Sequence, residues 1–224
     1  MKDFLFNLLF PKICLSCGRE EDYLYQDCKA TLEILGIHQR YKTDYLSDLY
    51  FAINYQKPII KKMLQCFKYE PLIKDLTKPI SSLILSHFQL LDNKPNFTDF
   101  ILIPVPLEKK RLKWRGFNQA EEIAKELSSF LNIPLMSNCL IKAKETLPQA
   151  ELADEARRES VKGVFLVKNS EKIKNRKILL VDDVYTTGST MEGVARILKE
   201  AGGKEIIGLV FAQAKPEDDF LQNI

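Results

Sequence analysis

The chain has 224 residues, 46% of them hydrophobic, and 33 Lys and Arg against 30 Asp and Glu give it a formal charge of +3. This composition is typical of one folded domain, or of one domain with a small module, and it excludes a disordered or collagen-like chain. The longest apolar runs fall far short of the roughly 20 residues that a membrane span needs. No membrane insertion is therefore expected. Because no secretory signal is recognisable, we expect a cytoplasmic protein with reduced cysteines.

The first 45 residues differ from the rest of the chain because they hold most of its cysteines. Cys14 and Cys17 have the spacing with which two thiolates meet one tetrahedral metal ion, and Cys28 follows. We therefore predict a zinc-finger-like module over residues 1–45. A cluster without metal remains an alternative, whereas a redox pair is disfavoured because no strand of a βαβ unit precedes these cysteines.

A structural zinc ion takes four protein ligands, so the three cysteines leave one position to fill. The candidates for this fourth ligand are Cys66, His38 and Asp27. We favour Cys66, because a thiolate is the best partner for three thiolates and Cys66 has no other evident role. A buried small hydrophobe is the alternative role for a lone cysteine.

Strands alternate with helices in the predicted second domain, residues 46–224. Apolar runs predict strands at 50–53, 100–103, 177–181 and 205–212, and helical spacing predicts helices at 59–67, 76–91, 118–131 and 191–198. Asn118 is placed to cap the third of these helices. The alternation predicts an α/β fold, a mostly parallel sheet with helices on both faces.

A basic run follows the strand at 100–103. It begins with a tight turn and continues with cations and the only tryptophan of the chain; its members are Val105, Pro106, Leu107, Lys109, Lys110, Arg111, Lys113, Trp114 and Arg115. Backbone donors and cations of this kind can hold an anionic group. An aromatic ring among cations can also stack on an unpaired base. The alternatives are a solvated basic loop and, for Trp114, a partly buried anchor.

The most informative segment runs from Ile178 to Thr190, where a buried strand leads into two carboxylates, a turn and a helix. Hydroxyls and backbone N–H groups at a helix start favour an anion, and Gly188 permits a positive φ. Asp182 and Asp183 can accept hydrogen bonds from vicinal hydroxyls or hold a hard cation. These features together favour a sugar phosphate over a plain helix cap.

This segment resembles the signature of type I phosphoribosyltransferases for 5-phosphoribosyl 1-pyrophosphate. The turn at 104–106 followed by Arg115-Gly-Phe-Asn-Gln narrows the resemblance to the ComF family (ComFC type), the competence-associated branch. Lys68-Tyr69, Gln149, Arg157 and 163–165 agree with this family. Two positions depart from it: Ser160 stands where Asn is usual, and Tyr25 stands where a further Cys is usual.

The resemblance implies a type I phosphoribosyltransferase fold behind a small N-terminal zinc-binding module. It implies binding of phosphoribosyl pyrophosphate with Mg²⁺ by Asp182, Asp183, Val184, Tyr185, Thr186, Thr187, Gly188, Ser189 and Thr190. The pyrophosphate would lie at Val105, Pro106, Leu107, Arg111 and Arg115. The stretch 149–165, rich in Glu and Arg, is interpreted as a mobile lid, and an ordinary exposed helix is the alternative.

The resemblance also implies a role in natural transformation, with single-stranded DNA and proteins of the competence machinery as partners. The DNA-binding residues would be Lys109, Lys110, Lys113, Trp114 and Arg115. A conventional nucleobase phosphoribosyltransferase and a non-catalytic adaptor that binds phosphoribosyl pyrophosphate remain alternatives. The sequence indicates no general base, so turnover stays open.

Overall fold

The computed structural model describes residues 11–142 and 164–214. Its main strands are β1 (Asp48–Asn54), β2 (Phe100–Pro104), β5 (Lys177–Tyr185) and β6 (Glu205–Gln213). Its longer helices are α3 (Pro58–Lys68), α4 (Thr77–Leu90), α6 (Gln119–Leu131) and α8 (Ser189–Glu200). All eight elements overlap the segments predicted from hydrophobic spacing, which confirms those predictions.

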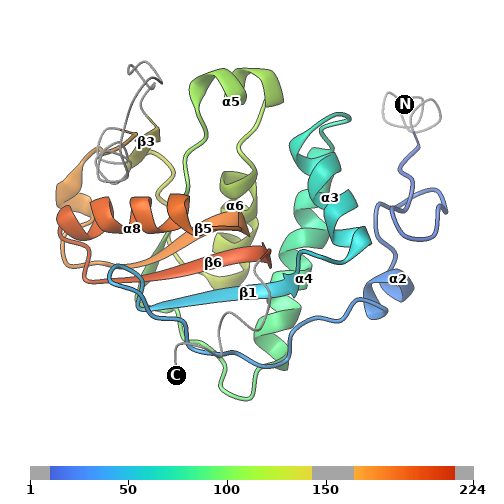
Figure 1. Cartoon of the computed structure of the whole chain (residues 1–224), viewed down its shortest axis with the longest axis horizontal. Helices are drawn as coiled ribbons and strands as arrows, with labels where there is room; N and C mark the ends of the chain where they lie inside the picture. Colours follow the sequence, from blue (N-terminus) through green and yellow to red (C-terminus); the bar gives the residue numbers. More distant parts are fainter. Residues whose placement is uncertain (1–10, 143–163, 215–224) are drawn as a thin grey trace.

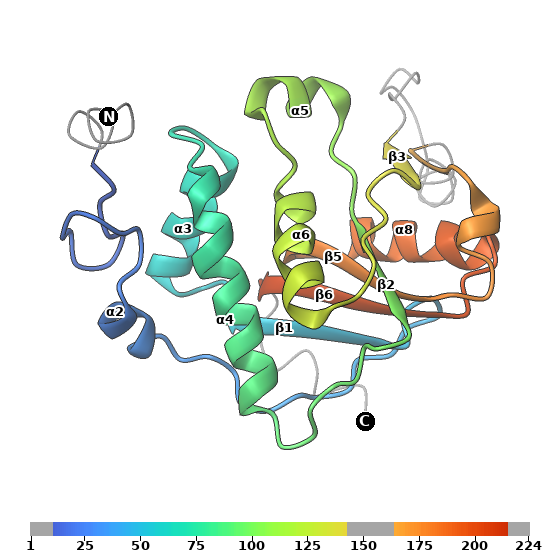
Figure 2. The same ribbon diagram turned by 180° about the vertical axis from the view of Figure 1, so that it is seen from behind.

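The four main strands form one parallel sheet in the order β1-β6-β5-β2. A bridge between Leu102 and Leu135 extends the sheet beside β2. A separate two-stranded antiparallel ribbon pairs β3 (Leu140–Lys142) with β4 (Phe165–Val167). Figures 1 and 2 show the sheet between α8 on one side and α4 and α6 on the other.

Side chains of β5 alternate between the two faces of the sheet, as a strand requires. Leu179 and Val181 belong to the core that α3, α4 and α6 cover, whereas Ile178 and Leu180 belong to the core beneath α8. All four are fully buried. This double burial explains the continuous apolar run in the sequence, and it fixes the strand whose end carries the two acids.

The basic run forms a helix, α5 (Lys109–Arg115), which the sequence analysis did not predict. Lys, Arg and Leu are good helix formers. Gly116, with φ +79°, ends the helix in the left-handed conformation. Helix α5 stands apart from the layers, at the end of two connecting segments (Figure 1).

Asn118 caps α6 as predicted, because its side chain accepts a hydrogen bond from the Ala120 N–H. The helix ends at Asn132, which adopts the left-handed conformation with φ +54°. Both ends of α6 are therefore defined locally. The helix places Asn118 and Gln119 next to the turn that follows β2.

The described part of the N-terminal segment packs beside α3 and α4 (Figures 1 and 2). It contains the short helix α2 (Gln26–Ala30), and it adds Cys14, Leu24 and Cys28 to the core beneath those helices. Lys29 Nζ bonds Ser82 Oγ at 2.6 Å, and Lys12 pairs with Asp75 at 2.6 Å. The domain boundary at residue 45 stays a prediction.

Part of the predicted lid lies outside the described residues, including Gln149, Arg157, Ser160 and Gly163. The end of this stretch is described, and Phe165 begins β4. Among the helices of the described ranges, none has the length and apolar character required to cross a membrane.

Candidate functional site

Two stretches far apart in the sequence meet in one pocket of about 340 Å³. The turn after β2 supplies one wall, and the end of β5 with the start of α8 supplies the other. The pocket is lined by Lys68, Tyr69, Val105, Pro106, Leu107, Arg111, Arg115, Asn118, Gln119, Ala120, Lys142, Asp182, Asp183, Val184, Thr186 and Thr190. It lies at the carboxyl ends of parallel strands, where open α/β sheets bind ligands.

The pocket brings together the whole predicted pyrophosphate set and five of the nine predicted phosphoribosyl-binding residues. The other four, Tyr185, Thr187, Gly188 and Ser189, form the body of the turn behind it. Sequence reasoning left Lys68, Tyr69, Asn118, Gln119 and Lys142 out of the site. Lys68-Tyr69 was noted only as a family feature, because nothing in the sequence indicates that the end of α3 reaches β5.

The two acids occupy different environments at the base of the pocket. Asp183 is 7% exposed, and its Oδ1 is 2.8 Å from Lys68 Nζ. Asp182 accepts a hydrogen bond from the Asp183 N–H at 2.8 Å. Burial, together with the charge of Asp183, raises the pKa of Asp182 to about 7. Asp182 therefore exchanges a proton near neutral pH.

Lys68 is held charged by its surroundings. Burial alone would lower its pKa, but the charge of Asp183 and the hydrogen bond to it outweigh burial and raise the pKa. Lys68 is the last residue of α3, and the next turn is fixed by the Tyr69 N–H, which donates to Gln65 O at 2.8 Å. The helix thus delivers one cation to the paired acids.

The turn between β5 and α8 has the backbone that the sequence predicts. Gly188 adopts φ +82°, and a Cβ there would collide with the Tyr185 hydroxyl. Only glycine fits this position without strain. Thr187 Oγ1 and Ser189 Oγ are 2.8 Å apart and exposed, while Thr186 and Thr190 face the pocket. The turn therefore offers hydroxyls and the first N–H groups of a twelve-residue helix.

A segment before β1 supports this turn from behind. Tyr41 Oη and Tyr185 Oη are 3.1 Å apart, and Thr43 Oγ1 donates to Glu192 Oε2 at 2.9 Å. Burial, with the contact to Tyr41, raises the pKa of Tyr185 and keeps its hydroxyl neutral. These contacts depend on tertiary packing and could not be predicted from the sequence.

The turn after β2 is held by hydrogen bonds at both of its sides. The Val105 N–H donates to Val181 O at 2.9 Å, and Asn118 Nδ2 donates to Val105 O at 3.0 Å. Buried Gln119 accepts from Arg115 Nη1 at 3.0 Å and donates to Phe67 O at 2.8 Å. Gln119 thereby connects the end of α3 to the base of α5.

The charges that line the pocket favour an anion. Four cations, Lys68, Arg111, Arg115 and Lys142, face two acids. Even with both acids ionised, these side chains carry a net positive charge. A pocket of this charge, with a helix N-terminus at one wall, can hold a phosphorylated ligand.

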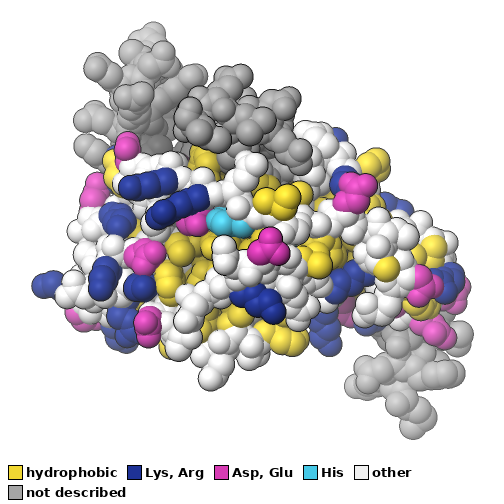
Figure 3. Space-filling view, turned by 90° about the horizontal axis from the view of Figure 1, so that it is seen from below, with side chains coloured by type: hydrophobic (Ala, Val, Ile, Leu, Met, Phe, Trp, Pro, Cys, Tyr) yellow, Lys and Arg dark blue, Asp and Glu magenta, His cyan; other side chains and the backbone are white. Residues whose placement is uncertain are grey.

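The residues predicted to meet nucleic acid lie along α5. Lys109, Lys110, Lys113 and Trp114 are exposed, and Arg115 is partly buried at the pocket. The face seen in Figure 3, turned away from α5, carries Lys and Arg side chains mixed with Asp and Glu around an apolar centre. That face therefore carries charges of both signs. Helix α5 differs, because its seven residues include five cations and no acid.

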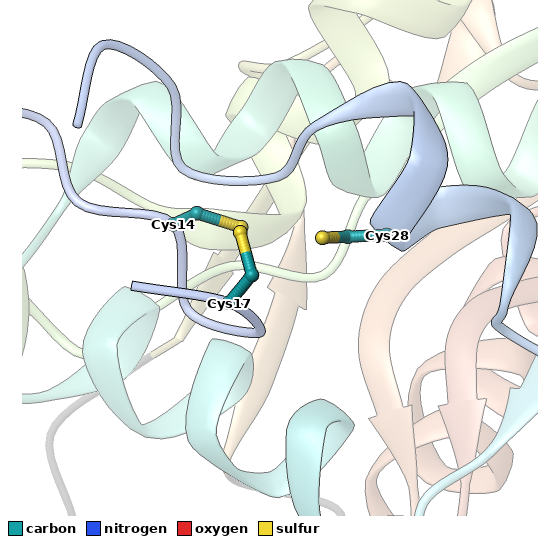
Figure 4. Close-up of side chains that lie close together, drawn as sticks. All are labelled: Cys14, Cys17 and Cys28. Carbon is teal, nitrogen blue, oxygen red and sulfur yellow. The ribbon is translucent and has the colours of Figure 1, made fainter. Parts of the chain in front are cut away.

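The three N-terminal cysteines converge, with their sulfur atoms directed toward one another (Figure 4). The three Sγ atoms of Cys14, Cys17 and Cys28 all lie within 4.8 Å of one another. Tetrahedral zinc with Zn–S bonds of about 2.3 Å needs sulfur atoms about 3.8 Å apart. Small adjustments would therefore allow these thiolates to hold zinc, and the cluster fits the metal.

None of the three candidates for a fourth ligand joins the cluster. Cys66 packs against the main core, and burial raises its pKa. His38 stacks on Tyr50, with ring centroids 3.9 Å apart, and bonds Asp48 at 2.9 Å. The described residues thus supply three metal ligands.

Asp27, the third of those candidates, pairs with Arg19 at 2.8 Å. Arg19 Nε also donates to Cys17 Sγ at 3.3 Å. This contact lowers the pKa of Cys17 to about 6, which favours the thiolate that a metal needs. The Arg19 guanidinium lies over the Tyr25 ring, at 4.2 Å from its centroid. Tyr25, which stands where the family has a further Cys, thus helps to place the arginine.

Comparison with known proteins agrees with this geometry. The family model described as phosphoribosyl transferase domain matches residues 114–222. Competence protein F of Haemophilus influenzae is 39% identical over 106 residues, which cover 47% of this chain and 46% of that protein. Competence protein ComFC of Bacillus subtilis is 36% identical over 103 residues, covering 46% of this chain and 40% of that protein.

A third relative is the DNA utilization protein YhgH of Escherichia coli O157:H7, which is 32% identical over 105 residues, or 47% of this chain and 45% of that protein. Among solved structures, the phosphoribosylpyrophosphate synthetase of Mycobacterium smegmatis has 17% identity and a TM-score of 0.37, over 65% of this chain and 36% of that one. A likeness at this level carries no weight in the assignment.

The parallel sheet and the acid-and-hydroxyl turn after β5 are those of a phosphoribosyltransferase domain, with a cysteine cluster in front of it. Over about half of its length, the chain is similar to curated proteins of the ComFC type. The chain spans about half the length of these relatives, or less. The family resemblance and the fold class predicted from the sequence are confirmed.

Proposed function

We propose that this protein binds 5-phosphoribosyl 1-pyrophosphate together with Mg²⁺ in the pocket at the end of β5. The observation that carries the proposal is the meeting of two distant stretches, 105–115 and 182–190, around one positively charged pocket. A ligand with phosphate at one end and pyrophosphate at the other matches this arrangement. The ribose hydroxyls between them match the two carboxylates.

Each part of the donor has partners in this arrangement. The 5-phosphate would accept hydrogen bonds from the turn at 186–190, where hydroxyls and the first N–H groups of α8 are gathered. The ribose hydroxyls would donate to Asp182 and Asp183. The pyrophosphate would meet Arg111 and Arg115, and Mg²⁺ would be shared by its oxygens and an acid.

The same protein is proposed to bind single-stranded DNA, as a cytoplasmic component of natural transformation. Its relatives carry the names competence protein and DNA utilization protein. Exposed cations on α5 would meet the DNA phosphates. Zinc held by Cys14, Cys17 and Cys28 would fix the N-terminal segment against α3 and α4.

Isothermal titration calorimetry with phosphoribosyl pyrophosphate and Mg²⁺ tests the proposal. The wild-type protein is expected to bind, and the double variant Asp182→Asn, Asp183→Asn is expected to lose binding. Asp92→Asn, in the exposed loop after α4, is the matched control and should bind as the wild type does. Equal binding by the double variant and the wild type would contradict the site assignment.

A further inference from the structure

Two exposed aromatic rings stand at the edge of the pocket. Tyr69 follows α3, and Trp114 lies on α5. Their ring centroids are 6.5 Å apart, and the rings are tilted by 54°. Each residue is 53% exposed. The two rings therefore contact one another while leaving large apolar faces to solvent.

Cations surround this pair. The guanidinium of Arg115 lies 5.4 Å from the centroid of the Tyr69 ring. Lys113 and Lys110 are exposed on α5, the helix that carries Trp114. Single exposed aromatic residues are common on protein surfaces. A pair assembled from two elements and flanked by cations is the arrangement that binds an unpaired base and its phosphate.

The pair borders the sugar-phosphate pocket directly. Tyr69 and Arg115 line that pocket together with Asp182 and Asp183. Lys68, next to Tyr69 in the chain, bonds Asp183 at 2.8 Å. A planar group stacked on these rings would therefore lie beside a ribose held at the acids.

We propose that Tyr69 and Trp114 form a stacking platform for an unpaired nucleobase, continuous with the sugar-phosphate pocket. The continuity rests on the proposed function, since it assumes that the pocket holds phosphoribosyl pyrophosphate. The platform itself depends only on the rings and their flanking cations. Because both ligands would contact the Tyr69 and Arg115 region, the occupancy of one site should change the affinity of the other.

The chain supplies its own probe, because Trp114 is its single tryptophan. Addition of a thymidine oligonucleotide should quench its fluorescence in a saturable way. Tyr69→Leu should weaken the affinity for the oligonucleotide at least about fivefold, as expected for loss of one stacked base. Phe130→Ala, which removes a 66% exposed ring from α6, is the matched control and should leave the affinity unchanged.

Further titrations identify the source of the base and test the continuity. Quenching by a free nucleoside monophosphate would identify single nucleotides as ligands, whereas quenching by the oligonucleotide alone would identify nucleic acid. Saturating phosphoribosyl pyrophosphate with Mg²⁺ should change the oligonucleotide affinity at least about threefold. An unchanged affinity would overturn the continuous site.

Two separate measurements test the proposed function and the stacking platform. Absence of phosphoribosyl pyrophosphate binding with intact, Tyr69-dependent quenching would remove the proposed function and the continuity, but not the platform. If neither the oligonucleotide nor the nucleoside monophosphate quenched the Trp114 fluorescence, the platform would be overturned. Wild-type affinity of the Tyr69→Leu variant for the oligonucleotide would overturn the platform as well.

Discussion

The two adjacent acids, Asp182 and Asp183, differ in their environment because Lys68 forms an ion pair with Asp183. Asp183 pairs with Lys68, whereas Asp182 is partly buried, and burial together with the charge of Asp183 raises its pKa to about 7. A protonated carboxyl keeps one acceptor oxygen, but it offers two acceptor oxygens, and the negative charge that a hard cation prefers, only after it loses the proton. Ligand binding and deprotonation of Asp182 are therefore linked.

This linkage predicts a pH dependence of donor binding. Below pH 7 the free protein must release the Asp182 proton when it binds, so affinity should fall up to about tenfold per pH unit. Calorimetry between pH 5.5 and 8, in buffers of different ionisation enthalpy, measures the affinity and the released proton together. Affinity and proton release that do not change over this range would contradict the raised pKa.

Lys68 offers a second test at the residue scale. Lys68→Met leaves Asp183 buried without its countercharge, and we expect a loss of about 1–3 kcal/mol in the free energy of unfolding. Asp183→Asn in the same protein should recover most of that loss, because the unpaired charge is gone. Urea unfolding of the two single variants and the double variant measures the coupling. Additive effects would show that the ion pair contributes nothing to stability.

At the scale of elements, the turn between β5 and α8 depends on one glycine. In Gly188→Ala the new Cβ would collide with the Tyr185 hydroxyl, and the residue would keep an unfavourable positive φ. The affinity for phosphoribosyl pyrophosphate should therefore fall at least about tenfold. Gly18→Ala has a similar φ, +77°, but open space around the added Cβ. This control should lose stability without losing donor affinity by calorimetry. Similar donor affinity in both variants would contradict a role for the close contact.

Substitution of a single cysteine tests whether the cysteine cluster binds a metal. Cys14→Ser should remove zinc, and Cys66→Ser should retain it, because Cys66 lies outside the cluster. Elemental analysis of the purified variants gives the zinc content directly. A wild-type zinc content in the Cys14→Ser variant would contradict zinc binding by this cluster. Loss of zinc in Cys66→Ser would instead restore Cys66 as the fourth ligand.

Elements with strong periodicity could be predicted from the sequence, and elements defined by tertiary contacts could not. The apolar run of β5 and the stripe of α8 determine where Asp182 and the turn lie. Helix α5 was missed because its charged residues have no buried face to set a period.

The candidate site shows the same division. Its two walls each follow a strand, so their meeting could be predicted. The contributions of Lys68, Tyr69 and Gln119 could not, because they require the end of α3 to lie against α6 and β5. The contacts of Tyr41 and Thr43 behind the turn likewise come from a segment with no motif of its own.

At the scale of the whole molecule, binding of a polyanion must come from local surface, since the formal charge is only +3. Single-stranded DNA binding through α5 should weaken as salt rises. Replacing Lys109, Lys110 and Lys113 by Gln should reduce the slope of log affinity against log salt by about 2. Fluorescence anisotropy with a labelled oligonucleotide measures this slope. Replacement of three exposed lysines elsewhere, Lys61, Lys78 and Lys94, is the control and should change it little. An affinity that does not respond to salt would contradict binding through these lysines.

The cysteine segment and the helices of the main domain share one core, since Cys14 and Cys28 are buried with residues of α3 and α4. Helix α3 in turn delivers Lys68 to Asp183 and accepts the hydrogen bond from Gln119. The cysteine cluster and the pocket are thus joined through a single helix. This arrangement gives the cysteine segment a structural reason to lie beside the domain that holds the pocket.

A crystal structure with phosphoribosyl pyrophosphate and Mg²⁺ would show directly whether this pocket holds the ligand. We expect the 5-phosphate at residues 186–190, the ribose hydroxyls at Asp182 and Asp183, and the pyrophosphate beside Val105 and Arg115. Density for the donor elsewhere, or a ligand in the pocket whose ribose turns away from both acids, would contradict this expectation.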